Sequence, residues 1–128
     1  MELTKHSCRE LMVASLGLAR GPSGEATKDS VAAAIRQMGA LQLDTIHVVA
    51  RSPYFVLWSR LGSYEARWLD ELLAEGEIFE YWSHEASYLP AEDYPLYRRL
   101  QLDRGSKARH WLGENPEVVQ SVLDYVRA

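Results

Sequence analysis

The chain has 128 residues, 47% hydrophobic and 25% charged, which suits one globular domain and excludes a disordered segment. Its net charge of −4 counts against an ordinary nucleic-acid-binding domain, which is usually basic. The single cysteine, Cys8, excludes a disulfide framework and a multi-cysteine zinc site, and we interpret it as a buried small apolar residue. No apolar run could span a bilayer and residues 1–6 lack a signal-peptide pattern, so we expect a cytoplasmic protein with no membrane partner.

The N-terminal third predicts two helices and a short strand. Residues 4–18 show helical periodicity, and residues 7–10 have the spacing of a capping box. Residues 27–38 form a second helical pattern, with Thr27 as its cap and Gly39 as its stop. The alternation of leucine with polar residues over 40–43 then has the period of two that is typical of a strand.

The rest of the chain predicts further helices and one hairpin. Ser52 as N-cap and Pro53 at the first helical position start a new helix, and Trp58 and Trp68 fall on apolar helical stripes, which places them in the core. The turn at residues 83–84 joins two aromatic-rich segments. We therefore predict helices over 45–51, 52–60 and 64–75, strands over 77–82 and 85–89, a helix from Pro90 to about 102, and a last helix from 115.

The order helix, strand, helix, helix, hairpin predicts a winged helix, a variant of the helix-turn-helix. The expected fold class is mainly α with a small β component. We expect residues 1–114 to hold an N-terminal helix and the winged helix, and residues 115–128 to be the first helix of a following, truncated domain. Fold alone does not give function.

A polar pair lies on the predicted strand. If Leu41 and Leu43 face a core, Gln42 and Asp44 emerge together on the other face, where they could hold and orient a water molecule. A simpler interpretation stands beside this one, because Asp44 is a good N-cap for a helix over 45–51 and Gln42 could be a solvated strand residue. The two interpretations are compatible.

Several motifs resemble those of the YcaQ-type DNA glycosylases, relatives of AlkZ, which are built from tandem winged-helix domains. The resemblance runs from about residue 27 to 90 and is carried by segments that are long and nearly free of gaps. These segments are Gln42-Leu43-Asp44-Thr45-Ile46, Val48-Val49-Ala50-Arg51-Ser52-Pro53-Tyr54, Leu57-Trp58-Ser59-Arg60-Leu61-Gly62, Trp68-Leu69-Asp70-Glu71 and Glu80-Tyr81-Trp82-Ser83-His84-Glu85-Ala86.

The resemblance implies that Gln42 and Asp44 are catalytic. The family motif is Gln, an aliphatic residue, then Gln or Asp, and the Asp form present here is associated with removal of alkylated bases and unhooking of interstrand crosslinks. His47 stands where a smaller polar residue is expected, which bears on substrate preference. The resemblance implies that the partner is double-stranded DNA with alkylated or crosslinked purines. It also implies a monomeric protein that is associated with the nucleoid in the cytoplasm. Family members are longer, so we expect this chain to be an N-terminal part.

These residues suit glycosidic bond hydrolysis. An N7-alkylated purine is cationic and leaves as a neutral base, so the barrier lies in the oxocarbenium-like sugar and in placing a water. An ionised Asp44 can stabilise that cation and accept the proton of the water, and Gln42 can orient the water by donating and accepting hydrogen bonds. No lysine adjoins the motif, which disfavours a Schiff-base lyase. No cofactor is implied.

Other polar residues are candidates for contacts with DNA. Arg51, Ser52, Tyr54 and Arg60 follow the motif and could contact phosphates, although a solvated helix face explains them equally well, with Tyr54 partly in the core. His84 at the hairpin turn could reach a groove, or could be an ordinary turn residue. We expect no metal site, because His84-Glu85 has no second histidine at ligand spacing. The alternative functions are a non-catalytic winged-helix DNA-binding or regulatory module, and a domain that serves only interaction or structure.

Overall fold

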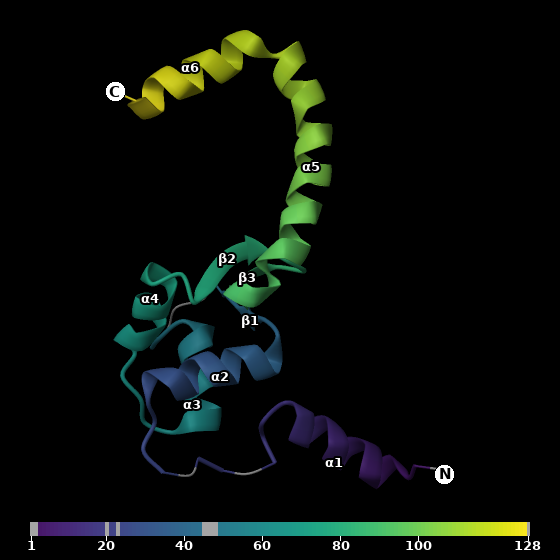
Figure 1. Ribbon diagram of the computed structural model, residues 1–128, viewed down its shortest axis with the longest axis vertical. Helices are drawn as coiled ribbons and strands as arrows, with labels where there is room; N and C mark the ends of the chain where they lie inside the picture. Colours follow the sequence, from purple (N-terminus) through teal and green to yellow (C-terminus); the bar gives the residue numbers. More distant parts are fainter. Residues whose placement is uncertain (1–2, 20, 23, 45–48, 128) are drawn as a thin grey trace. The chain divides into compact units, whose positions relative to one another are not determined.

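A computed structural model describes residues 3–19, 21–22, 24–44 and 49–127. Contacts divide the chain into two compact units, Met1–Glu92 and Asp93–Ala128. The first unit holds four helices and the sheet in its described residues, and the second holds two helices (Figure 1). The predicted fold class is confirmed: the chain is mostly helical with a small antiparallel sheet, and the element order after the first helix is compatible with a winged helix.

Helix α1 (Lys5–Ser15) has polar contacts at both of its ends, from Thr4 at the first turn and from the Gln37 amide to the Ser15 carbonyl at the last. Thr4 is its N-cap and accepts from the Ser7 backbone N–H at 3.1 Å, so the capping box predicted at Ser7 is wrong. None of its residues is buried, and the predicted burial of Cys8 is wrong because this helix places no face in the core. Beyond its C-terminal end, Arg60 donates from Nε to the Leu16 carbonyl at 2.9 Å.

Helices α2 (Lys28–Met38), α3 (Ser52–Leu61) and α4 (Arg67–Ala74) pack with the sheet around one core. Helix α2 matches its predicted bounds because both ends are fixed locally: Thr27 and Ser30 form a reciprocal capping box, and Gly39 ends the helix with a φ of 73°. The buried residues of the core are Val31, Ala32, Ala34, Ile35, Leu41, Leu57, Leu69, Leu72, Ile78 and Tyr88.

The sheet has the strand order β1-β3-β2 and is antiparallel throughout. Its strands are β1 (Leu41–Gln42), β2 (Ile78–Trp82) and β3 (Ala86–Pro90), each within one or two residues of its prediction. Leu41 pairs with Tyr88, and Tyr88 pairs in turn with Glu80, so β3 joins the short first strand to the hairpin. The sheet therefore fixes the position of β1 from one side and the core fixes it from the other.

Four details around α3 and α4 differ from the predictions. Of the helix expected over 45–51, residues 45–48 lie outside the described residues, and residues 49–51 are not helical. Helix α3 has Arg51 rather than Ser52 as its N-cap. Trp58 is 59% exposed, because the buried face of α3 is set by Pro53 and Leu57, one turn apart, and Trp58 points away from them. Helix α4 begins at residue 67 rather than 64.

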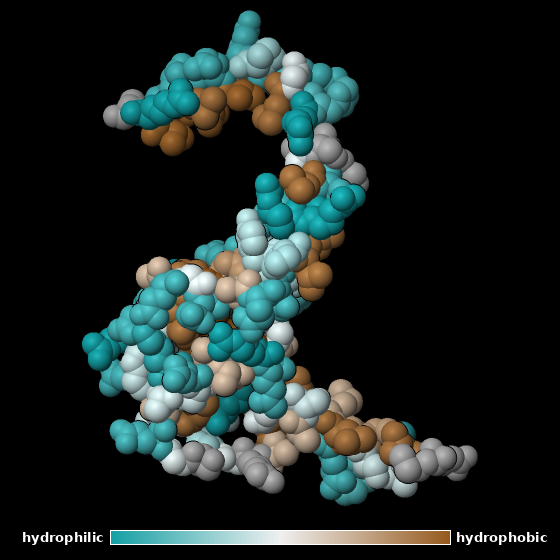
Figure 2. All heavy atoms as spheres, viewed as in Figure 1, coloured by the Kyte–Doolittle hydropathy of each residue, from teal (hydrophilic) through white to brown (hydrophobic). Residues whose placement is uncertain are grey.

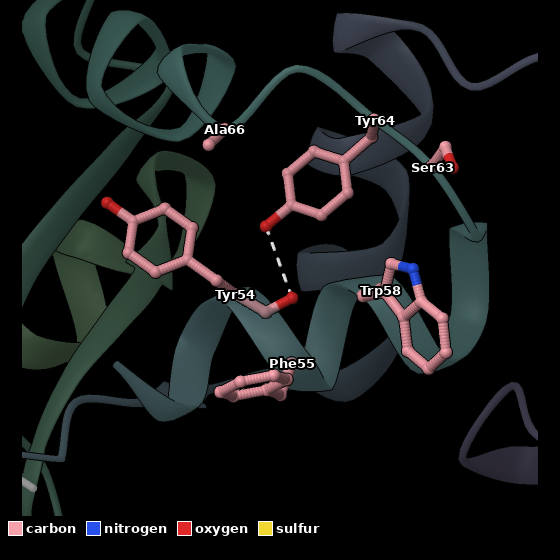
Figure 3. A pocket seen from close by; sticks show the side chains of 6 residues that line it. All are labelled: Tyr54, Phe55, Trp58, Ser63, Tyr64 and Ala66. Carbon is pink, nitrogen blue, oxygen red and sulfur yellow. Dashed lines mark hydrogen bonds between the residues drawn. The ribbon is translucent and has the colours of Figure 1, made fainter. Parts of the chain in front are cut away.

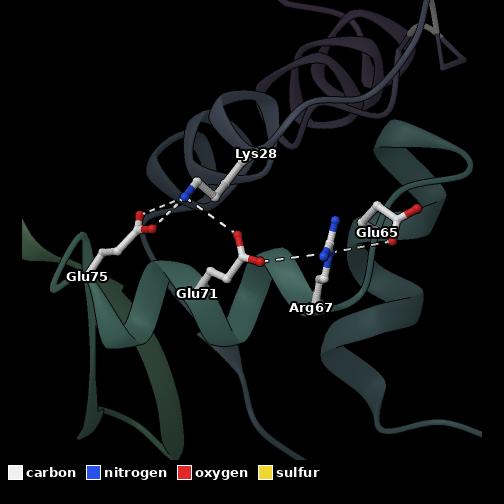
Figure 4. A network of polar contacts seen from close by, with 5 residues as sticks. All are labelled: Lys28, Glu65, Arg67, Glu71 and Glu75. Carbon is white, nitrogen blue, oxygen red and sulfur yellow. Dashed lines mark hydrogen bonds and ion pairs between the residues drawn. The ribbon is translucent and has the colours of Figure 1, made fainter.

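Ion pairs join α2 to α4 and to the hairpin. The Lys28 ammonium lies 2.6 Å from the Glu75 carboxylate and 3.6 Å from that of Glu71, which in turn lies 3.8 Å from Arg67 (Figure 4). Arg36 pairs with Glu77 and Glu92 at 2.9 and 2.7 Å. Ion pairs within the first unit thus occupy the carboxylates of Glu71, Glu75, Glu77 and Glu92.

The second unit consists of α5 (Tyr94–Glu114) and α6 (Pro116–Arg127). The predicted helix start at Pro90 is wrong: Pro90 is buried at the end of β3 and pairs with Ile78, and α5 starts four residues later with Pro95 in its first turn. Helix α6 begins at Pro116, within one residue of its prediction, and gathers its apolar side chains on one side (Figure 2). The start of a following domain at residue 115 stays a prediction.

Candidate functional site

Strand β1 is held rigidly at the position of the predicted motif. Gly39 turns the chain out of α2, and two residues later Leu41 enters the core, where it is 1% exposed. The Leu43 backbone N–H donates to the Ala86 carbonyl at 2.7 Å, and Leu43 packs against the core at its edge. Both leucines therefore point inward, as the alternation predicted, although Leu43 is only partly buried.

Gln42 is exposed on the face opposite Leu41. Its partner across the ladder is Ser87, a fully buried residue whose hydroxyl donates to the Glu85 carbonyl at 3.0 Å. Because Leu43 and Ala86 form a hydrogen-bonded pair, Gln42 and Ser87 form the intervening non-hydrogen-bonded pair, in which side chains lie closer together. The Gln42 amide is thus presented outward from a strand whose opposite side is packed.

Asp44 follows two residues after Gln42 and is half-buried. The helix that it would cap falls on residues 45–48, and His47 belongs to the same segment, so both predictions lie outside the described residues. The predicted catalytic roles of Gln42 and Asp44 stay predictions. The structure describes an exposed amide and a half-buried carboxylate at the end of one anchored strand.

The predicted DNA-contact residues fall into different surroundings. Arg51 is exposed, while Ser52 and Tyr54 are half-buried in the first turn of α3, and Tyr54 packs against the core as expected. Arg60 instead donates from Nε to the Leu16 carbonyl and from Nη1 to the Val56 carbonyl at 2.9 Å, and burial lowers the pKa of its guanidinium. His84 is exposed in the bend of the hairpin.

A cluster around Tyr88 was not anticipated from the sequence. Burial, then the charge of Glu80, raises the pKa of the Tyr88 hydroxyl, with smaller contributions from Tyr54 and Asp70 and an opposing one from Arg51. These residues come from both hairpin strands, α4 and the start of α3. Only long-range pairing could reveal such a cluster, because no local motif connects its members.

An aromatic pocket of about 400 Å³ lies on α3 and the loop that follows it. Figure 3 shows Phe55 and Trp58 projecting from α3, and Tyr64 reaching back from the loop so that its hydroxyl donates to the Tyr54 carbonyl at 3.3 Å. Ser63 and Ala66 complete the lining. Burial raises the pKa of Tyr64 to about 12. The spacing of Phe55 and Trp58, three apart in a helix, is the sequence signal that could have found this pocket.

Neither a metal site nor a membrane helix is evident in the described part of the chain. No three His, Cys, Asp or Glu side chains among those residues are grouped so that they could hold a metal ion. Among the helices in the described ranges, none has both the length and the apolar character needed to cross a membrane.

Comparison with known proteins identifies the family. No solved structure matches the chain. The model of the AlkZ-like DNA glycosylase family matches residues 35–128, a segment that contains β1, the sheet and both units' later helices. This match covers well over half of the chain and agrees with the resemblance seen in the motifs. The chain therefore belongs to the AlkZ-like DNA glycosylase family.

Proposed function

We propose that this protein hydrolyses the N-glycosidic bond of N7-alkylated purines in DNA, and that the same site unhooks crosslinked purines. Membership of a DNA glycosylase family supports the reaction class and DNA as the substrate. The observation that carries the finer proposal is the placement of Gln42 on the exposed face of a packed strand, with the Asp44 carboxylate two residues further on. The partner we propose is double-stranded DNA, bound by one copy of the chain.

In the proposed reaction, a water held by the Gln42 amide attacks C1′ of the lesion's sugar. The bond from C1′ to N9 breaks, and its electron pair neutralises the positive charge of the alkylated base. The Asp44 carboxylate opposes the cation that develops on the sugar and accepts the proton that the water loses. No group needs to protonate the leaving base, because N7-alkylation has already made it a good leaving group. Two residues therefore suffice for the chemistry.

We further propose that the enzyme is monofunctional. A lyase step through a Schiff base needs a lysine near the sugar. The sequence has no lysine between Lys28 and Lys107. The Lys28 ammonium lies 2.6 Å from the Glu75 carboxylate, which holds it in its ionised, non-nucleophilic form and raises its pKa. These features support simple hydrolysis by water.

The charge of α4 disfavours the alternative of a winged-helix module that reads DNA with its helices. In a helix-turn-helix, the second helix of the pair enters the major groove, and here that helix is α4. Its charged residues are Arg67, Asp70 and Glu71, with Glu75 at its C-cap, and Glu71 and Glu75 pair with Lys28. Inserting this helix would bring carboxylates against phosphates. The acidic surface of α4 therefore supports the glycosylase over the regulatory module.

The test is base release from DNA that contains 7-methylguanine. We expect Asp44→Asn to slow release by roughly a hundredfold or more, as for loss of a main electrostatic group. Folding should change by about 1 kcal/mol at most, because Asn can replace Asp as a cap. Affinity for DNA should stay equal or rise, because a charge that repels phosphate is lost.

Asp124→Asn is the matched control, since it removes one exposed carboxylate from α6 and should leave release unchanged. Unchanged release in Asp44→Asn with a normal melting temperature would reduce Asp44 to a helix cap and favour the binding module. Release from a crosslinked duplex, measured in parallel, tests whether unhooking uses the same carboxylate.

A further inference from the structure

Ser87 is an unusual residue among the buried side chains of the sheet. Tyr88 apart, it is the only buried residue with a polar side chain in the part of the chain that the structure describes, and it is fully enclosed. Its neighbours along β3, Tyr88 and Leu89, are buried as well. A small apolar residue would fill such a position without the cost of removing a hydroxyl from water. A serine here therefore points to a role for its hydroxyl.

Ser87 lies directly beside Gln42 on the face of the sheet opposite Leu41. The register pairs the two residues across β1 and β3. The hydrogen bond from the Leu43 N–H to the Ala86 carbonyl, at 2.7 Å, makes them a non-hydrogen-bonded pair. The side chains of such a pair share one face, with Cβ atoms about 4.5–5.5 Å apart. The Gln42 amide extends beyond its own Cβ, so it can reach the Ser87 hydroxyl.

The Ser87 hydroxyl can act toward Gln42 only as an acceptor. A hydroxyl has a single hydrogen, and that of Ser87 is donated to the Glu85 carbonyl at 3.0 Å. Its oxygen keeps lone pairs that a neighbouring N–H can use. Of the two ends of the Gln42 amide, only Nε2 carries hydrogens. A hydrogen bond between the two side chains therefore places Nε2 toward Ser87 and Oε1 outward.

The orientation of the Gln42 amide decides its effect on a bound water. In the proposed reaction the water directs a lone pair at C1′, so both of its hydrogens need acceptors. The Asp44 carboxylate is one acceptor, and Gln42 Oε1 is the other when it points outward. In the reverse orientation Nε2 would donate to the lone pair of the water and weaken it as a nucleophile. An acceptor beside Nε2 thus favours the productive orientation.

We propose that Ser87 is a positioning residue for Gln42, through a hydrogen bond from Gln42 Nε2 to the Ser87 hydroxyl that forms when DNA covers this face of the sheet. In the free protein Gln42 is exposed, so water satisfies its amide. DNA removes that water, and a buried amide without partners is costly, so the amide turns to the adjacent hydroxyl. The inference rests on the proposed function, because the proposed hydrolysis is what gives the Gln42 amide a task.

A double-mutant cycle tests whether Ser87 acts through Gln42. Single-turnover release of 7-methylguanine by the full chain is measured for Ser87→Ala, for Gln42→Ala and for the double variant. We expect Ser87→Ala to slow release about fivefold, on the scale of one hydrogen bond. The double variant should be no slower than Gln42→Ala alone, because two residues that act as one unit are not additive. Ser87→Thr keeps the hydroxyl and should restore release.

A second measurement does not depend on base release. The chain is labelled with ¹⁵N-glutamine and mixed with duplex DNA at low salt, and the Gln42 side-chain signal is assigned by NMR from its loss in Gln42→Ala. We expect DNA to move a hydrogen signal of this amide downfield, and we expect Ser87→Ala to abolish that shift. Ser15→Ala is the matched control, because it removes a hydroxyl that likewise donates to a nearby carbonyl, that of Met12 at 2.9 Å.

Losses that multiply in the double variant would overturn the proposal, and so would a Gln42 signal that responds to DNA equally with and without the Ser87 hydroxyl. Normal release in Ser87→Ala beside slow release in Gln42→Ala would count against this inference alone. Normal release in Gln42→Ala would instead count against the proposed hydrolysis. Melting temperatures check that each variant is folded, and the cycle of alanine variants stands even where Ser87→Thr is too large for its site.

Discussion

The two units of this chain form helices for different physical reasons. In the first unit, α2 places Val31 and Ile35 fully inside a core shared with two helices and a sheet. In the second unit, α6 has an equally clear apolar side, yet Val118 and Val122 stay more than half exposed. An amphipathic pattern thus predicts a helix in both units, but burial requires a partner that the pattern does not specify.

The units also differ in charge. Residues 1–92 carry an excess of acidic groups, eight Lys and Arg against 13 Asp and Glu, whereas residues 93–128 carry six against five. The candidate catalytic residues lie in the acidic unit, and five of the six Lys and Arg residues of 93–128 lie along α5. A negative net charge for the whole chain therefore hides a basic segment, which is why total charge is a poor guide to DNA binding.

The largest effect should come from truncating the core of the first unit. Leu57 is fully buried in α3, a helix that packs against α2 and β1, so Leu57→Ala should lower the free energy of unfolding by about 2–5 kcal/mol. Val122→Ala on the exposed side of α6 should change it by less than about 0.5 kcal/mol. Urea unfolding followed by circular dichroism measures both. A comparable loss in Val122→Ala would show that α6 is packed in solution.

The second-largest expected effect is on the rate of base release, when Gln42 of the strand motif is changed. Gln42→Ala should slow release of 7-methylguanine by about tenfold, less than Asp44→Asn, because water can reorient partly without the amide. Gln120→Ala is the control from α6, where the exposed amide donates to Asp124 at 2.7 Å. Single-turnover kinetics with both variants measures the difference. An equal loss in both would mean that glutamine at position 42 has no special role.

The sequence predicted those parts of the fold that are fixed locally. Helix α2 has side-chain caps within its own residues, and the hairpin has aromatic strands around a short turn, so both were found within one or two residues. The outward direction of Gln42 followed from a period of two. The prediction failed where the end of an element depends on a distant partner. Pro90 pairs with Ile78, so β3 extends to Pro90 and the next helix begins later than predicted.

The sequence could not predict which side chains are exposed, or which residues from distant segments lie close together in the fold. Trp58 and Cys8 were placed in the core from residue type, but none of the residues of α1 is buried and the buried side of α3 is occupied by Pro53 and Leu57. The groups around Tyr88 come from three segments that only the folded chain brings together. The environment of Asp44 depends on residues 45–48, so its role rests on the family motif and on strand alternation.

A third, smaller effect tests the difference in charge. We expect residues 1–128 to bind undamaged DNA weakly and with a steep salt dependence, carried by exposed arginines of α5 such as Arg98 and Arg109. Each Arg→Ala change there should weaken binding a few-fold and reduce the slope of log affinity against log salt by about one. Arg36→Ala, whose guanidinium is paired with Glu77 and Glu92, should have no effect. Tight binding that ignores salt would contradict this view.

The smallest expected effect is on the pH dependence of stability, which should differ between a buried and an exposed tyrosine hydroxyl. The pKa of Tyr64 is raised from 10.0 to about 12 in the folded protein, so the fold favours its neutral form. Stability is therefore fully present below pH 10 and falls as pH rises toward 12, because the unfolded chain loses its proton first. Tyr64→Phe should cost about 0.5–1 kcal/mol at neutral pH, through loss of the hydrogen bond to the Tyr54 carbonyl, and should flatten this alkaline decline.

Tyr125→Phe on α6, where the side chain is exposed, should do neither. Chemical unfolding at a series of alkaline pH values measures both variants, and an unchanged decline in Tyr64→Phe would place its cause elsewhere in the fold.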